Sequence, residues 1–180
     1  MALQLSLAHW NCLGIRSYIP EFIWHLNNIK DTPNILCFQE TFCIFEKDYL
    51  EIPGYTLATF SSRGVNRGGT AIYVKKYINY STVDFQSTFE TSAIYFIHNS
   101  KKFLILNLYD PKLDTKYEDY DALLSQITTE NILCGDFNAH HTLWGKRIDT
   151  YKGRELFKCI QDNNICLLNE GSGTRLNPIN

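Results

Sequence analysis

The 180-residue chain contains little glycine and proline, ten and five residues, and has no internal repeat or low-complexity segment. This composition excludes collagen-like, disordered and linker proteins. The chain also lacks an apolar stretch near the ~18 residues that span a bilayer. Its N-terminus alternates polar and apolar residues and does not resemble a signal peptide. We therefore expect a soluble, intracellular protein with no membrane partner.

An excess of positive charge is missing as well. Lys and Arg number 17 against 19 Asp and Glu, which gives a net charge of −2. A protein that holds nucleic acid through bulk charge is usually clearly basic. Binding of a polyanion must therefore depend on a local site, a bound cation or a confined basic patch.

The six cysteines form no Cys-x-x-Cys pair. Four of them lie in apolar runs, as Cys37 does within Ile35–Phe38 and Cys134 does after Ile132 and Leu133. This placement favours buried, reduced thiols of an intracellular protein over a disulfide framework.

Hydrophobic residues make up 44% of the chain and aromatic residues 14%, enough for one packed domain over residues 1–180 that is rich in strands. The hydrophobic pattern predicts helices over 15–29, Tyr117–Ile127 and Gly153–Asn163. It predicts strands over Leu3–Asn11, Ile35–Phe38, Tyr55–Phe60, Thr70–Val74, Tyr80–Phe85, Ser92–His98, Phe103–Tyr109, Ile132–Gly135 and Ile165–Asn169. We therefore expect an α/β fold, a sandwich of two mixed, largely antiparallel sheets flanked by helices.

Polar clusters follow three of the expected strands: Trp10–Cys12, Gln39–Thr41 and Gly135–Asn138. Binding sites of α/β folds gather at the carboxyl ends of strands. The clusters offer carboxylates and carboxamides, hard oxygen ligands that suit Mg²⁺ or Mn²⁺. Any one cluster alone is explained as a turn or a helix cap. When all three clusters are considered together, a shared binding site is as good an explanation as turns and caps.

Five motifs in order extend this pattern along nearly the whole chain: Trp10–Ile15, Leu36–Thr41, Gly68–Ile72, Asn107–Pro111 and Leu133–His141. Together they resemble the exonuclease–endonuclease–phosphatase superfamily. The His-His-x-x-Trp-Gly run at His140–Gly145 is most similar to the endonuclease domains of non-LTR (LINE-type) retrotransposons.

The resemblance implies a Mg²⁺-dependent phosphodiesterase and assigns a role to each matching residue. Glu40 matches the principal Mg²⁺ carboxylate, and Asn11 matches the asparagine beside that metal. Tyr109 matches a tyrosine that reaches the scissile phosphate, Asp136 the aspartate that orients or deprotonates the attacking water, and Asn138 the carboxamide that holds the phosphate. These residue types suit phosphodiester hydrolysis, which needs a Lewis acid, an activated water and hydrogen-bond donors.

The chain departs from the family pattern after Gly173–Arg175. The family continues into two further strands with a Ser-x-x-Asp element and a terminal Ser-Asp-His, and no Asp-His or Ser-Asp pair occurs in this sequence. We therefore expect a domain that is incomplete at its C-terminus, misses its last strands and has impaired activity, because catalytic residues that act as a unit fail together.

The resemblance assigns no role to several basic and aromatic side chains, which are interpreted from the sequence alone. Arg63, Arg67, Lys75 and Lys76 surround an expected hairpin and suit DNA phosphates as well as a solvated surface. His140 and His141 lack His-x-x-x-His spacing, which favours packing or substrate contact over metal ligation. Trp144 is expected to anchor a loop. Of these we assign Arg67, Lys75 and His140 to substrate binding.

The expected function is nicking of DNA by a retrotransposon-type endonuclease, whose parent element carries a reverse-transcriptase domain and acts in the nucleus. The alternatives are an abasic-site endonuclease or a phosphatase of the same superfamily, a non-catalytic nucleic-acid-binding remnant, and a decayed product without function.

Overall fold

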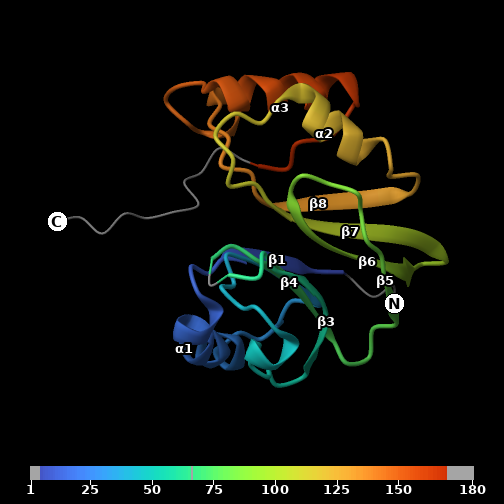
Figure 1. Ribbon diagram of the computed structural model, residues 1–180. Coiled ribbons are helices and arrows are strands. Elements are labelled where there is room, and N and C mark those ends of the chain that lie inside the picture. The colour runs from blue at the N-terminus through green and yellow to red at the C-terminus, as the bar shows by residue number, and fades with distance from the viewer. Residues whose placement is uncertain (1–4, 66, 170–180) are drawn as a thin grey trace. The chain divides into compact units, whose positions relative to one another are not determined.

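The computed structural model describes residues 5–65 and 67–169, and the chain divides into two compact units (Figure 1). The first unit comprises Met1–Pro111 and Gln126–Phe137, and the second comprises Lys112–Ser125 and Asn138–Asn180. Both sheets and helix α1 belong to the first unit, and helices α2 and α3 belong to the second.

One sheet has the strand order β1-β2-β4-β3. Its strands are β1 (Leu7–Asn11), β2 (Ile35–Gln39), β3 (Tyr55–Ser61) and β4 (Thr70–Lys75). β1 and β2 run parallel, while β4 is antiparallel to both of its neighbours. Every residue of β2 is buried, as its continuous apolar sequence predicts for a strand covered on both faces.

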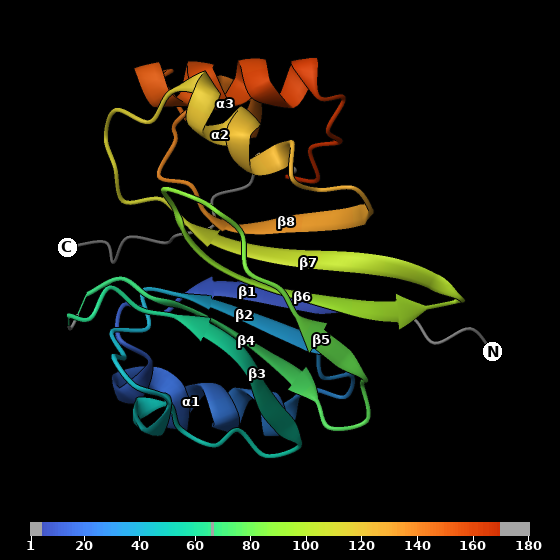
Figure 2. The same ribbon diagram turned by 45° about the vertical axis from the view of Figure 1, so that its right-hand side comes forward.

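Helix α1 (Ile15–Asn28) covers the outer face of this sheet, as Figure 2 shows. Ile15, Ile19 and Leu26 are buried and pack with residues of the sheet. Gly14 precedes the helix with a φ of 101°, a conformation that favours glycine. Pro20 is the sixth residue of the helix, so the backbone there lacks one amide donor.

The other sheet has the order β5-β6-β7-β8. Its strands are β5 (Tyr80–Thr82), β6 (Glu90–His98), β7 (Lys101–Tyr109) and β8 (Glu130–Asp136). β5, β6 and β7 are antiparallel neighbours, and β8 runs parallel to β7. Each sheet therefore contains one parallel pair, β1 with β2 and β7 with β8.

The two sheets pack face to face within the first unit (Figure 2). The layer between them is apolar, because alternate residues of each strand point inward. Its buried residues are Ile35, Cys37, Ile72, Val74, Ile94, Phe96, Ile105 and Cys134. The prediction of an α/β sandwich with two mixed sheets is thus confirmed.

A polar contact joins the sheets at one end of this apolar layer. Asn107 of β7 is fully buried, and its Nδ2 donates to the carbonyls of Phe38 and Ala71 at 2.9 and 3.2 Å. Its Oδ1 accepts from Gln39 Nε2 at 2.5 Å. Buried polar groups need such partners, so Asn107 fixes the position of β7 against β2 and β4.

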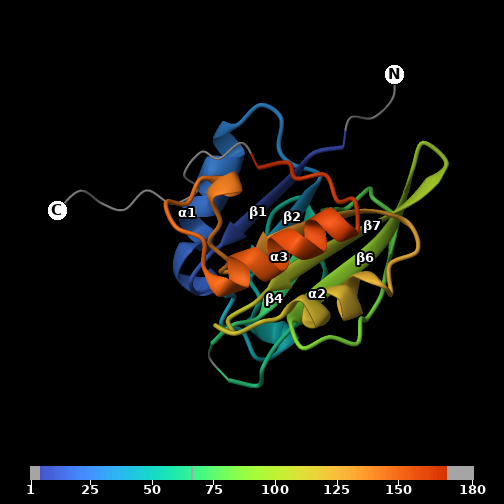
Figure 3. The same ribbon diagram turned by 90° about the horizontal axis from the view of Figure 1, so that it is seen from above.

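The second unit contains α2 (Tyr117–Leu124) and α3 (Tyr151–Asp162), which pack against each other (Figure 3). Thr150 caps α3, since its hydroxyl accepts from the Gly153 amide at 3.1 Å. The short 3-10 helix Thr142–Trp144 precedes α3.

Three expected strands differ from the structure. The first begins at Leu7, since residues 5 and 6 are described and lie outside β1. Residues 165–169 form neither helix nor strand, so the strand prediction for Ile165–Asn169 is wrong; Leu168 in this run is 74% exposed and lacks the burial that a strand of apolar residues needs. The strand expected over Tyr80–Phe85 ends at Thr82. Beyond it, the Val83 amide donates a hydrogen bond to the Ala93 carbonyl of β6. The residues expected at the start of the first strand, up to position 4, lie outside the described residues.

All six cysteines are free thiols. Burial is confirmed for five of them, whereas Cys166 is exposed. Burial raises the pKa of Cys12 to about 12 and that of Cys43 to about 11. In the part of the chain that the structure describes, no helix has the length and apolar character to traverse a membrane.

We expect Asn107→Leu to lower the free energy of unfolding by about 3 kcal/mol, because two buried carbonyls would lose a donor and Gln39 Nε2 would keep only its 3.4 Å bond to the Cys37 carbonyl. Urea denaturation followed by fluorescence measures this loss. Asn131→Ala, which removes an exposed amide of β8, is the control and should change stability by less than about 0.5 kcal/mol. A loss below about 1 kcal/mol for Asn107→Leu would contradict the proposed clamp.

A thiol reagent should modify one cysteine rapidly in the native protein, the exposed Cys166. The other thiols are buried, and the thiolate is the reactive form, so they should react only after the chain unfolds. Mass spectrometry of the labelled peptides identifies the sites, and Cys166→Ser should abolish the fast phase.

Candidate active site

Four strand ends meet at one edge of the sandwich in the first unit. Asn11 ends β1 opposite Gln39, the end of the parallel strand β2. Tyr109 ends β7 opposite Asp136, the end of the parallel strand β8. Parallel pairing brings the carboxyl ends of each pair together, and the inter-sheet contacts of β1 and β2 with β8 bring the pairs together.

Asn11 lies between two carboxylates. Its Nδ2 donates to Glu40 Oε1 and to Asp136 Oδ2, both at 2.7 Å. Its Oδ1 accepts from the Leu13 amide at 3.2 Å. One carboxamide from β1 therefore holds together two acids that are 96 residues apart in the sequence (136 − 40).

The loop after β2 aims the Glu40 carboxylate. Glu40 has a φ of 53°, a left-handed conformation that is uncommon for residues other than glycine. The carbonyls of Glu40 and Thr41 accept from the Gly14 and Ile15 amides at 2.8 and 3.1 Å. These bonds to the start of α1 maintain the conformation of the loop.

Tyr109 contacts the same carboxylate. Its hydroxyl forms a hydrogen bond with Glu40, and the negative charges of Asp136 and Glu90 are near. Burial first, and then these carboxylates, raise the pKa of Tyr109 above its ordinary value. The phenol therefore stays protonated and acts as a hydrogen-bond donor.

A close backbone contact positions Asp136. Gly135 has a φ of 144°, and a Cβ at this position would overlap the carbonyl oxygen of Leu108 in β7. Glycine therefore allows β8 to approach β7, and the Asp110 amide donates to the Asp136 carbonyl at 3.0 Å. Asn138 follows two residues later, in the second unit, with a φ of 46°.

Sequence reasoning did not assign two other polar residues at this edge. His9 lies two residues before Asn11, so both side chains point to the same face of β1. Burial lowers the pKa of His9, and the Asp136 charge and a hydrogen bond with Gln39 offset part of that effect. Glu90, the first residue of β6, pairs in register with Tyr109. A charged residue at the start of an apolar strand was the signal for it.

The donors at this edge fit a hard divalent cation. Among the described residues no group of three or more His, Cys, Asp or Glu side chains could hold a metal. Mg²⁺ does not require one, because it binds through one or two carboxylates and keeps water or substrate phosphates as its other ligands. Glu40 and Asp136 supply such carboxylates. Asn11 faces them with its amide nitrogen, so its amide would have to turn before its oxygen could act as a ligand.

The three residues assigned to substrate binding lie in different places. Arg67 is exposed in the β3–β4 hairpin, at the end of β4 where Thr70 pairs with Gln39. Lys75 lies at the other end of β4, and its Nζ is 4.4 Å from the centroid of the Tyr55 ring. This cation–π contact gives Lys75 a packing role away from the carboxylates. His140 is exposed in the second unit.

His141 and Trp144 have structural roles in the second unit. The buried His141 ring lies 4.6 Å from the Phe157 ring and 4.9 Å from the Trp144 ring, measured between centroids. Trp144 Nε1 donates to the Ala139 carbonyl at 2.8 Å. The expectations of packing for His141 and of loop anchoring for Trp144 are confirmed.

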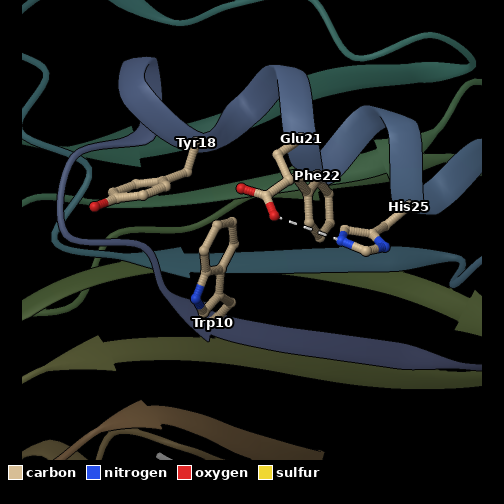
Figure 4. A pocket seen from close by; sticks show the side chains of 5 residues that line it. All are labelled: Trp10, Tyr18, Glu21, Phe22 and His25. Atoms are coloured by element: carbon tan, nitrogen blue, oxygen red, sulfur yellow. Dashed lines mark ion pairs between the residues drawn. The ribbon is translucent and has the colours of Figure 1, made fainter. Parts of the chain in front are cut away.

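An aromatic cavity of about 390 Å³ lies between β1 and α1 in the first unit (Figure 4). Trp10, Tyr18, Glu21, Phe22 and His25 line it. The Trp10 and Phe22 rings stack with centroids 5.5 Å apart. Trp10 and Asn11 are successive strand residues and point to opposite faces of β1. The cavity is therefore separate from the Glu40 and Asp136 carboxylates.

Residues 8–178 match the Endonuclease/Exonuclease/phosphatase family. The chain belongs to this family. The match includes all five ordered motifs and confirms the resemblance seen in the sequence. Comparison with curated protein sequences gives no match.

Solved structures of the same fold include several nucleases. The endonuclease domain of TRAS1, a telomere-specific non-LTR retrotransposon, is similar with a TM-score of 0.67 at 17% identity, over 93% of this chain and 74% of that one. An AP endonuclease from Archaeoglobus fulgidus has a TM-score of 0.59 at 22% identity, over 89% and 71%. The catalytic domain of Xenopus laevis APE2 has a TM-score of 0.64 at 17% identity, over 87% and 67%.

Tyr109 should lose its proton only well above pH ~10, the ordinary range for tyrosine. The unfolded chain releases this proton first, so stability should fall as the pH rises past about 10 toward the folded-state pKa. Urea denaturation at about pH 8 and pH 11 should show a smaller loss for Tyr109→Phe than for the wild type. Tyr151→Phe, which removes an exposed hydroxyl, is the control. An equal loss in wild type and Tyr109→Phe would contradict the raised pKa.

Proposed function

We propose that this chain is a Mg²⁺- or Mn²⁺-dependent endonuclease domain that hydrolyses phosphodiester bonds of DNA, of the type found in non-LTR retrotransposons. The observation that carries this proposal is the Asn11 amide shared by the Glu40 and Asp136 carboxylates. Membership in the Endonuclease/Exonuclease/phosphatase family supports hydrolysis at phosphorus.

Asp136 is the proposed base. Its carboxylate accepts a proton from the attacking water, whose oxygen forms the new bond to phosphorus. Asn11 keeps Asp136 near Glu40, the proposed metal ligand. A bound Mg²⁺ would act as a Lewis acid that stabilises negative charge on the phosphoryl oxygens.

Tyr109 and Asn138 are the proposed phosphate donors. The neutral phenol of Tyr109 keeps its proton beside the carboxylates and can donate it to a phosphate oxygen that replaces Glu40 as the acceptor. Asn138 is proposed as a phosphate donor because it lies in the same family motif as Asp136, two residues further along the chain. The bond between phosphorus and the 3′ oxygen breaks, and that oxygen takes a proton from solvent water, which leaves a 3′-hydroxyl and a 5′-phosphate. In the parent element that hydroxyl would prime a reverse transcriptase in the nucleus.

The proposed DNA contacts are local, since the net charge of −2 excludes bulk attraction. Arg67 and His140 are exposed and can contact the phosphate backbone. The TRAS1 endonuclease domain and the Archaeoglobus fulgidus AP endonuclease support a nucleic-acid substrate by their fold.

We expect the 180-residue polypeptide to convert supercoiled plasmid to the nicked form in the presence of Mg²⁺. The rate should be low, because no Asp-His pair is present in the sequence and loss of one member of a catalytic unit costs several orders of magnitude. Glu40→Ala and Asp136→Ala should reduce nicking to the level without enzyme, and EDTA should do the same. Extension of the nick by a DNA polymerase tests for the 3′-hydroxyl.

Glu130→Ala is the matched control, because it removes an exposed acid that pairs with Lys101 at the far end of β8. Nicking that persists in Glu40→Ala contradicts the assignment of the site. Salt-sensitive DNA binding without any turnover supports the alternative of a non-catalytic nucleic-acid-binding protein. Cleavage confined to abasic DNA supports the repair-endonuclease alternative.

A further inference from the structure

Glu90 is a nearly buried carboxylate beside the candidate active site. It is the first residue of β6, opposite Tyr109, and its side chain is 10% exposed. A buried carboxylate is costly unless charged or hydrogen-bonding partners stabilise it. Glu90 has two, the backbone amide of Gly69 and the guanidinium of Arg63.

The first partner connects Glu90 to the loop that carries Glu40. Glu90 Oε2 accepts from the Gly69 amide in the turn before β4. The Gly69 and Gly68 carbonyls accept from the Thr41 and Phe42 amides at 3.2 and 2.9 Å. A chain of hydrogen bonds therefore runs from Glu90 through the turn to Thr41 and Phe42, the two residues that directly follow Glu40.

The turn leaves no room for another arrangement. A Cβ on Gly68 would lie 2.5 Å from Glu90 Oε2, and a Cβ on Gly69 would lie 2.5 Å from Thr41 Oγ1. Both glycines also have positive φ values, 69° and 88°. A side chain at position 68 would therefore collide with the Glu90 carboxylate, and one at position 69 would collide with Thr41.

The second partner holds the carboxylate itself. Arg63 Nε pairs with Glu90 Oε1, and the Arg63 side chain is 42% exposed. Arg63 thus balances the charge of the carboxylate at Oε1, while Oε2 accepts the hydrogen bond from the Gly69 amide.

We propose that Glu90 is a positioning residue, held by Arg63, which fixes the Gly68–Gly69 turn and thereby sets the Glu40 carboxylate for metal binding. This inference deepens the proposed function and rests on it for the role of Glu40. Partners behind a metal ligand typically change metal affinity by 10–100-fold when they are removed.

Hydrogen exchange tests the link without any metal or substrate. In Glu90→Ala and in Glu90→Asp, whose shorter side chain cannot reach the turn, the Thr41 and Phe42 amides should exchange faster than in the wild type. Glu90→Gln keeps an acceptor for the Gly69 amide and should restore most of the protection. Glu130→Gln, which breaks the surface pair with Lys101, is the control and should leave these amides unchanged.

Binding of Mn²⁺, followed by electron paramagnetic resonance, tests the consequence for Glu40. Glu90→Ala and Glu90→Asp should weaken Mn²⁺ binding by about 10–100-fold, and Glu90→Gln by much less. Metal-free DNA binding should not weaken in any Glu90 variant, because removing a negative charge does not reduce attraction to a polyanion. A general folding defect would weaken both Mn²⁺ binding and DNA binding.

Wild-type exchange at Thr41 and Phe42 in a folded Glu90→Ala protein would overturn the inference. If Glu90→Ala does not fold, the same result in Glu90→Asp would overturn it. Faster exchange together with weaker Mn²⁺ binding supports it. Failure of the wild type to nick plasmid counts against the proposed function alone, because the exchange experiment needs no turnover.

Discussion

The site depends on one carboxamide between two acids. Unscreened carboxylates repel each other, and the Asn11 amide satisfies both with separate N–H groups at 2.7 Å. Asn11 can do this because β1 lies parallel to β2 and faces β8, so a single side chain reaches both sheets. The arrangement of the strands and the proposed chemistry are therefore consequences of the same pairing.

The same edge shows how polar groups are supported inside an apolar sandwich. Asn107 satisfies the carbonyls of β2 and β4 from the opposite sheet, and Glu90 satisfies the turn before β4 from that sheet as well. Loop residues with unusual backbone angles, such as Glu40, persist because these bonds over-determine them. Buried hydrogen bonds thus fix the positions of the polar side chains at this edge. The apolar layer between the sheets supplies most of the stability.

The sequence predicted the sandwich because its strands are long, apolar and close together, as in Ile35–Phe38. It predicted Glu40 and Asp136 because each follows a buried strand within a family motif. It did not assign Glu90 or His9. A charged residue at the start of an apolar strand is a weak signal for Glu90, and the partners of both residues come near them only through folding. Ile165–Asn169 was predicted as a strand from its apolar residues alone, although a strand also needs a backbone partner.

The bond between Asn11 and Asp136 spans 125 positions of the chain. During translation the amino-terminal sheet can therefore be complete while Asp136 is still in the ribosome, and the centre is assembled only when β8 is added. Contacts of such long range close slowly because a large loop must be ordered first. A nascent chain interrupted before β8 would carry Glu40 without Asp136, so the candidate site would remain incomplete.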